Sequence, residues 1–354
     1  MPAPVVGTAD LPELDELQRL VAEGAPLLHR HDLLEVEARG RRWPVPAVEL
    51  GSESPTCPLL VLVGGVHGLE RIGAAVVIAF LRHLVGRLAW DDSLHHLLCR
   101  LRILAVPLAN PGGIAAGTRA NPAGVDLMRN APVDADAPVP FLVGGQRWSS
   151  TLPWYRGADD APMQPEARAL LDAVRERAGR RDFVLVVDCH SGFGLSDRLW
   201  FPYAHTRRPF PWLAEAWRLQ QVLRLTHEHH RYVVEPQCRQ YLAHGDLWDH
   251  LTLGQAQRRP DQVFLALTLE MGSWLWVKKN PRQLFSRHGL FNPLIRHRQE
   301  RVLRRHVGLL DFLARATASR ERWRPAAGER QALTQAALAH WWDRVPLVDP
   351  PEGP

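Results

Sequence analysis

Three short apolar runs divide the chain, and each is bounded by residues that favour turns. The runs cover residues 57–63, 183–188 and 263–269. Continuous apolar runs of this length are typical of strands buried on both faces of a sheet. We therefore expect buried strands at 59–63, 183–188 and 263–269, with a further strand at 101–106.

Other segments repeat their apolar residues at helical spacing or alternate them with polar ones. Leu11, Leu14 and Leu17 lie on one helical stripe, with Asp10 available as a cap. Alternation of apolar and polar residues near 33–37 and 43–50 predicts a β-hairpin that turns near Gly40. The predicted helices are 8–24, 70–88, 164–180, 212–230, 294–317 and 329–342.

The order of these elements predicts an α/β protein, because strands alternate with helices along the chain. We expect the helix and hairpin of residues 1–50 to pack on a larger domain, 51–345, with a disordered Pro-rich tail at 346–354. Residues 110–164 carry little periodicity, and a loop of that length inside a domain is usually functional.

The amino-acid composition of the chain narrows the classes of protein to which it could belong. No segment of the 354 residues reaches the run of about 18 apolar residues that spans a membrane. The acidic first 20 residues carry no apolar signal segment, which predicts a cytoplasmic protein. The four cysteines are scattered, as expected of reduced thiols. The net charge of +5 could attract an anionic substrate or nucleic acid, but spread-out arginines favour a solvated surface and no nucleic-acid partner.

Polar residues follow the three apolar runs at equivalent places. His67 and Glu70 follow the first run after two glycines, His190 ends the second, and Glu270 ends the third. Two imidazoles and a glutamate form the ligand set of catalytic zinc sites that keep a fourth position open. A carboxylate that ends a buried strand is costly unless it is paired or functional, so Glu270 is the candidate general base.

The chain resembles the zinc carboxypeptidase family from about residue 58 to 275, and its loop resembles the bacterial murein peptide amidase branch. The resemblance rests on ordered motifs: His67-x-x-Glu70, Asn110-Pro111-Gly112-Gly113, Thr118-Arg119-x-Asn121-x-x-Gly124-Val125-Asp126-Leu127-x-Arg129-Asn130, His190 and Glu270. It implies a mixed, mostly parallel central sheet flanked by helices.

The resemblance also implies roles for individual residues. His67, Glu70 and His190 would bind one Zn²⁺ per chain, and Glu270 would act as base and proton shuttle. The remaining implied roles are these: Arg119 stabilises the oxyanion, Asp126 orients His67, Arg129 and Asn130 bind the substrate's terminal carboxylate, Tyr241 caps the substrate, and Trp248 lines the specificity pocket.

One position departs from the family pattern. Met128 stands where the family usually has asparagine, and a thioether cannot donate a hydrogen bond to a carboxylate. Ala131 replaces a frequent phenylalanine. The set of donors that would bind the substrate's terminal carboxylate is therefore incomplete, while the candidate zinc ligands and the candidate general base are all present.

Three functions remain open at this stage. The leading one is a zinc-dependent hydrolase that cleaves an amide bond in a small peptide, as a metallocarboxypeptidase or peptide amidase. The alternative is an N-acyl amino acid deacylase similar to the desuccinylase and aspartoacylase group. A non-catalytic basic binding protein is the distant third, because it would have no need for intact ligands and base.

Three charged clusters are interpreted as surface. The run from His227 to His230 sits at a predicted helix end, where neighbouring side chains point to different faces. His95 with His96 is similar. The arginines of 296–305 are expected to form a charged solvent-facing side of a helix.

Overall fold

The three apolar runs form neighbouring parallel strands in the middle of a sheet. In this computed structural model, which describes residues 11–229 and 232–343, they are β3 (Leu59–Gly64), β5 (Phe183–Ser191) and β8 (Val263–Met271). Every side chain of β3 and β5 is buried. Because both faces of these strands are covered, their sequences are continuously apolar rather than alternating between apolar and polar residues.

The described strands form one sheet in the order β1-β2-β4-β3-β5-β8-β6-β7. The β1–β2 hairpin and the β2–β4 and β6–β8 pairs are antiparallel, while the other pairs are parallel. The remaining bounds are β1 (His29–Ala38), β2 (Arg41–Gly51), β4 (Arg102–Val106), β6 (Arg198–Phe201) and β7 (Val233–Pro236). The expected mixed, mostly parallel α/β sheet is confirmed.

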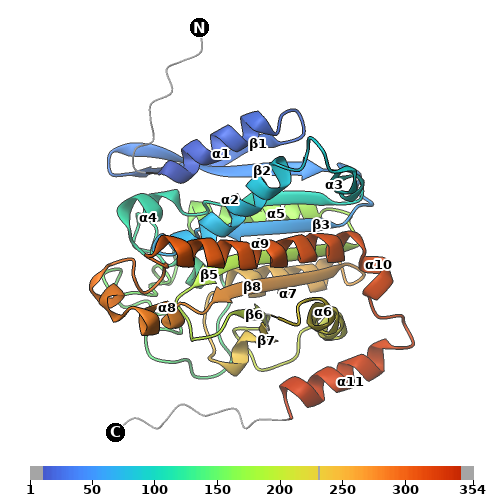
Figure 1. Cartoon of the computed structure of the whole chain (residues 1–354). Coiled ribbons are helices and arrows are strands. Elements are labelled where there is room, and N and C mark those ends of the chain that lie inside the picture. The colour runs from blue at the N-terminus through green and yellow to red at the C-terminus, as the bar shows by residue number, and fades with distance from the viewer. Residues whose placement is uncertain (1–10, 230–231, 344–354) are drawn as a thin grey trace.

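Helices cover both faces of the sheet (Figure 1). On one face α1 (Pro12–Glu23), α2 (Arg71–Val85) and α9 (Arg296–Ala318) pack together, and on the other lie α5 (Pro165–Ala178) and α7 (Leu247–Arg258). The other helices are α3 (Asp92–Leu98), α4 (Pro111–Ala116), α6 (Leu213–Thr226), α8 (Trp274–Lys279), α10 (Arg320–Trp323) and α11 (Arg330–Trp341), with 3₁₀ turns at Leu127–Arg129, Gln237–Arg239 and Pro281–Phe285. None of the described helices has the length and apolar character that a bilayer span requires.

The structure confirms the hairpin and the long predicted helices within a few residues, and it adds elements that the pattern did not indicate. β6 and β7 have four residues each, too few for a clear period. The expected loop at 110–164 contains α4 and a 3₁₀ turn but is otherwise irregular. The predicted cap Asp10 and the predicted tail lie outside the described residues. The expected division near residue 50 stays a prediction, although β1 and β2 belong to the common sheet.

Candidate metal centre and active site

The register of the central strands brings the predicted site residues to one rim of the sheet. Cys189 of β5 lies opposite Gly64, the last residue of β3, and His190 lies opposite Glu270 of β8. Parallel neighbours end at the same edge, where α/β folds form their clefts. The three polar strand ends therefore meet because the strands are adjacent and in phase.

The loop after β3 needs glycine at two places to carry His67 into the site. Gly65 has a φ of 66°, a left-handed conformation that glycine adopts without strain. A Cβ at Gly68 would lie 2.1 Å from the carbonyl carbon of Gly113, so only glycine permits this approach to α4. The loop can therefore turn sharply before His67 and pack closely against α4 after it.

Within the described residues, only His67, Glu70 and His190 form a group of three candidate ligands that could share one metal ion. Their ligand atoms all lie within 4.8 Å of one another, and all three side chains are buried. Glu70 Oε1 is 2.9 Å from His67 Nδ1, Glu70 Oε2 is 3.1 Å from His190 Nδ1, and the two Nδ1 atoms are 3.2 Å apart. Ligands about 2.0–2.1 Å from a tetrahedral zinc are separated by roughly 3.3 Å, so this set fits the ion.

The outer nitrogen of each histidine faces a buried carboxylate. His67 Nε2 is 3.0 Å from Asp126 Oδ1, and His190 Nε2 is 2.8 Å from Asp188 Oδ2. At His67 this hydrogen bond holds a proton at Nε2 and leaves the lone pair of Nδ1 available to a metal ion, which is how carboxylates orient metal-binding imidazoles. At His190 the contact with Asp188 is a close ion pair. Both Nδ1 atoms face Glu70.

Arg119 closes the side of the site formed by the 110–164 loop. Its Nε donates to Asp126 Oδ2 at 2.8 Å, and its Nη1 donates to Glu70 Oε1 at 3.2 Å. The guanidinium carbon lies 5.7 Å from the centre of the Trp154 ring. Two carboxylates and an aromatic face thus hold one cation beside the metal-binding group.

Glu270 stands next to this group with an unused oxygen. It is partly exposed, and its buried Oε2 has no hydrogen-bond partner among the described residues. Burial, together with the nearby charge of Glu70, raises the pKa of Glu270 to about 8. A carboxylate in this state accepts a proton more readily than a solvated one.

Arg129 and Tyr241 lie in contact with each other, whereas the side chain of Asn130 forms hydrogen bonds with main-chain groups. Arg129 Nη2 donates to the Tyr241 hydroxyl at 3.4 Å, and its Nε donates to the carbonyl of Val143 at 3.2 Å. The Asn130 amide donates to the Arg156 carbonyl and accepts from the Gln164 amide. The Asn130 side chain therefore braces the long loop, with both of its polar functions engaged.

Trp248 is buried, and its indole contacts a carboxylate that sequence reasoning did not single out. Its Nε1 donates to Asp188 Oδ2 at 2.8 Å, the same oxygen that faces His190. Asp188 is fully buried on β5, two residues before His190 and so on the same face of the strand. The signal was present in the sequence as the one charged residue inside an apolar run.

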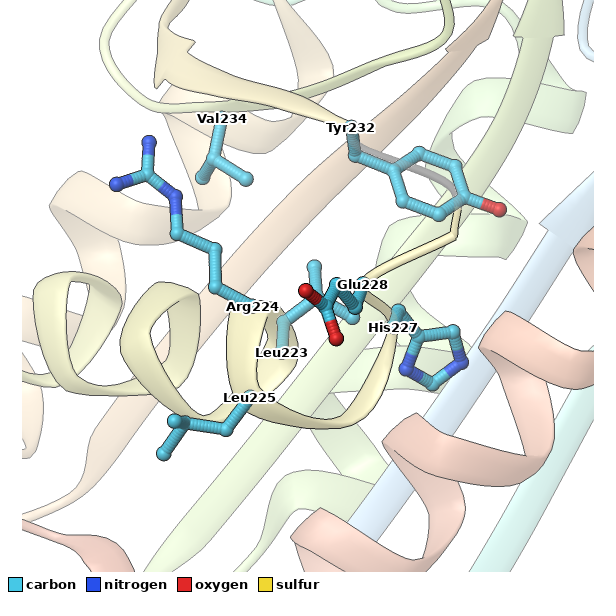
Figure 2. Close-up of a pocket in the computed structure, with 7 residues that line it drawn as sticks. All are labelled: Leu223, Arg224, Leu225, His227, Glu228, Tyr232 and Val234. Carbon is cyan, nitrogen blue, oxygen red and sulfur yellow. The ribbon is translucent and has the colours of Figure 1, made fainter.

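A cavity of about 600 Å³ lies away from this site, at the end of α6. The helix ends at Thr226, and His227 and Glu228 line the cavity with Leu223 and Tyr232. Figure 2 shows the imidazole of His227 and the carboxylate of Glu228 pointing in different directions. His230, which was also part of the predicted surface cluster, lies outside the described residues.

The geometry can be compared with known proteins. The model of the zinc carboxypeptidases (peptidase family M14) matches residues 34–272. No curated protein sequence matches the chain. One solved structure with the same fold is thrombin-activatable fibrinolysis inhibitor, with a TM-score of 0.61 and 15% identity over 86% of this chain and 71% of that one. Its bovine form in complex with tick carboxypeptidase inhibitor has a TM-score of 0.61 and 14% identity over 92% of this chain and 97% of that one. Carboxypeptidase A from Helicoverpa armigera has a TM-score of 0.52 and 17% identity over 82% of this chain and 71% of that one.

A mixed sheet with a buried His-Glu-His group at its rim, spaced to fit zinc, together with the match to the family model, identifies a metal-dependent hydrolase. The chain belongs to the zinc carboxypeptidase family, because the family model covers more than half of its length and the expected resemblance is confirmed.

Proposed function

We propose that this protein is a zinc-dependent hydrolase that cleaves an amide bond in a small peptide, with one zinc ion per chain. The observation that carries the proposal is the arrangement of His67, Glu70 and His190 at ligand spacing beside Glu270, whose Oε2 has no partner. A binding protein without catalysis would have no use for an unpartnered buried carboxylate oxygen.

The ion held by these three residues would supply Lewis acidity toward the amide carbonyl and toward a water molecule. Glu270 accepts a proton from the attacking water and delivers it to the leaving amine. Arg119, which Glu70 and Asp126 hold in place, donates to the oxygen that gains negative charge as the carbonyl is attacked. Asp126 and Asp188 keep the two imidazoles in the tautomer that presents Nδ1.

Arg129 is the residue that we propose for binding the carboxylate of the leaving group. Its guanidinium has the planar donor geometry that carboxylates prefer, and the Tyr241 hydroxyl lies beside it. Met128 adds no donor, since its side chain is buried in the hydrophobic core. The substrate's carboxylate would therefore be bound by Arg129 and Tyr241 alone. This favours an amide substrate whose carboxylate needs contact with one guanidinium rather than with a full set of donors.

The test measures metal content and hydrolysis together on purified protein. We expect about one zinc per chain in the wild type and in Glu270→Gln, and loss of zinc in His190→Ala. The Glu270→Gln variant should lose activity by about 10²–10⁴-fold, because the base is removed while the ligands stay. Hydrolysis is followed on a panel of short peptides and N-acyl amino acids, so that the deacylase alternative is measured in the same assay.

Matched controls come from the cavity at the end of α6. His227→Ala and Glu228→Gln replace the same residue types far from the site, and both should keep zinc and activity. A wild type that holds no zinc after loading, or wild-type rates in Glu270→Gln, would contradict the proposed function.

A further inference from the structure

A cavity of about 410 Å³ adjoins the candidate site on the outer side of Arg119. It is lined by the loop of residues 116–126, by residues 150–154, and by Leu69 and Arg287. Asp126 and Leu69 belong both to this lining and to the surroundings of the metal-binding group. The cavity and the candidate metal centre therefore share a wall.

The charges of the lining are unbalanced. Arg119 is matched by Asp126 and Glu70, as described above, and among the described residues that line the cavity Asp126 is the only acidic one. Arg287 is exposed, and none of the described residues forms a hydrogen bond or an ion pair with it. One uncompensated positive charge thus faces a cavity whose other walls include Leu152, Pro153 and Trp154.

The segment that carries Arg287 is tied to the site. The Asn292 side chain accepts from the amide of Ile72 and donates to the carbonyl of Leu69, and the Ser191 hydroxyl donates to the carbonyl of Phe291. His288 lies against the loop of residues 116–126, since a Cβ at Gly117 would be 3.4 Å from its ring. These contacts hold Arg287 near Arg119 without using its guanidinium.

We propose that this cavity binds a carboxylate on the acyl side of the scissile amide, so that acidic peptides are the preferred substrates. The inference rests on the proposed function: Arg129 would take the leaving group's carboxylate, which leaves the Arg119 side for the acyl part. Arg287 pairs with the acidic side chain, and the apolar walls contact its methylene groups.

The experiment compares two substrates of nearly identical shape, N-benzoyl-Glu-Ala and N-benzoyl-Gln-Ala, which differ by one charge. In the wild type, kcat/KM for the Glu substrate should exceed that for the Gln substrate by at least about fivefold, as expected for one charge-assisted contact at a partly open site. In Arg287→Gln the ratio should fall close to one, and in Arg287→Glu it should invert.

Arg282→Gln is the control, because Arg282 is an exposed arginine on the same segment that does not line the cavity. It should leave the Glu/Gln ratio unchanged. A wild-type ratio of one, or a ratio that Arg287→Gln does not alter, would overturn the proposal.

A separate measurement keeps this outcome distinct from failure of the proposed function. Binding of the acyl products N-benzoyl-Glu and N-benzoyl-Gln is measured by calorimetry on zinc-loaded wild type, Arg287→Gln and Arg282→Gln. Tighter binding of the Glu product that only Arg287→Gln abolishes supports the anionic subsite even if neither peptide is cleaved. Equal binding of both products by the wild type would refute it even if hydrolysis is seen.

Discussion

At the scale of single residues, the two candidate histidine ligands were not equally predictable. The partner of His67 could be expected, because Asp126 lies in a motif that resembles the family loop, and the structure places the two in contact. The partner of His190 was missed. Asp188 directly follows five apolar residues, so the local pattern indicates only the end of a buried strand. The contribution of Trp248 depends on a contact across 60 residues of sequence that no local pattern encodes.

Trp248 gives a prediction at this scale. Trp248→Phe removes the indole donor to Asp188 while keeping an aromatic ring, so Asp188 should hold the His190 tautomer less firmly. We expect zinc affinity to fall by about tenfold, with kcat at saturating zinc nearly retained. Affinity is measured by competition with a chelating dye.

Trp323→Phe is the control for the loss of a buried indole hydrogen bond. The indole of Trp323 donates to the carbonyl of Ala316, far from the site. The zinc affinity of this variant should match that of the wild type. If Trp248→Phe instead changed KM and left zinc affinity intact, Trp248 would line the substrate pocket, the role that the family resemblance implies, rather than position His190.

At the scale of elements, long periodic segments and continuous apolar runs were predictable from the sequence, and short elements were not. The residues that begin α7 illustrate the difference. Asp246 caps this helix by accepting from the amides of Trp248 and Asp249, a start signal that the sequence contained. It was overlooked because Leu247, Trp248 and Leu251 are all buried and leave no clear polar face.

The cap itself titrates in an unusual range. Burial and the neighbouring charge of Asp249 raise the pKa of Asp246 to about 7. A carboxyl group whose folded pKa lies above its unfolded value near 3.8 costs stability as the pH rises between the two values, and the full cost is present above pH 7. The protein should therefore gain from a neutral cap, most of all at alkaline pH.

Asp246→Asn tests this point, since asparagine is an equally good cap without the charge. Relative to wild type, its free energy of unfolding should improve by about 1–3 kcal/mol more at pH 8 than at pH 5. Denaturant unfolding at the two pH values measures the difference. A gain that is the same at both would mean that Asp246 is ionised across this range.

At the scale of the whole molecule, the alternation of strands and helices was enough to predict the fold class, but not how the N-terminal hairpin joins it. Nothing in the local pattern of residues 29–51 states that β2 pairs with β4. Glu49 of β2 connects three elements: it accepts from Arg102 of β4 at 2.6 Å and from Arg177 of α5 at 2.9 Å. Although burial opposes it, these two arginines hold the pKa of Glu49 below its usual value.

We therefore predict that the hairpin unfolds together with the sheet and not as a separate unit. Glu49→Gln leaves two arginines without their carboxylate, and it should lower the free energy of unfolding by about 1–3 kcal/mol at pH 7. Because the pKa of Glu49 is lowered in the folded state, this contribution is present above the unfolded value near 4.5, and the penalty should shrink as the pH falls below it.

Hydrogen exchange decides between one unit and two. In the wild type the amides of β1 and β2 should exchange through the same global opening as those of β3 and β5, and Glu49→Gln should accelerate all four strands in parallel. Glu53→Gln, an exposed change just after β2, should alter none of them. If residues 29–51 opened alone while β3 and β5 stayed protected, the first 50 residues would be an independent domain, and the sheet order alone would overstate their coupling to the candidate site.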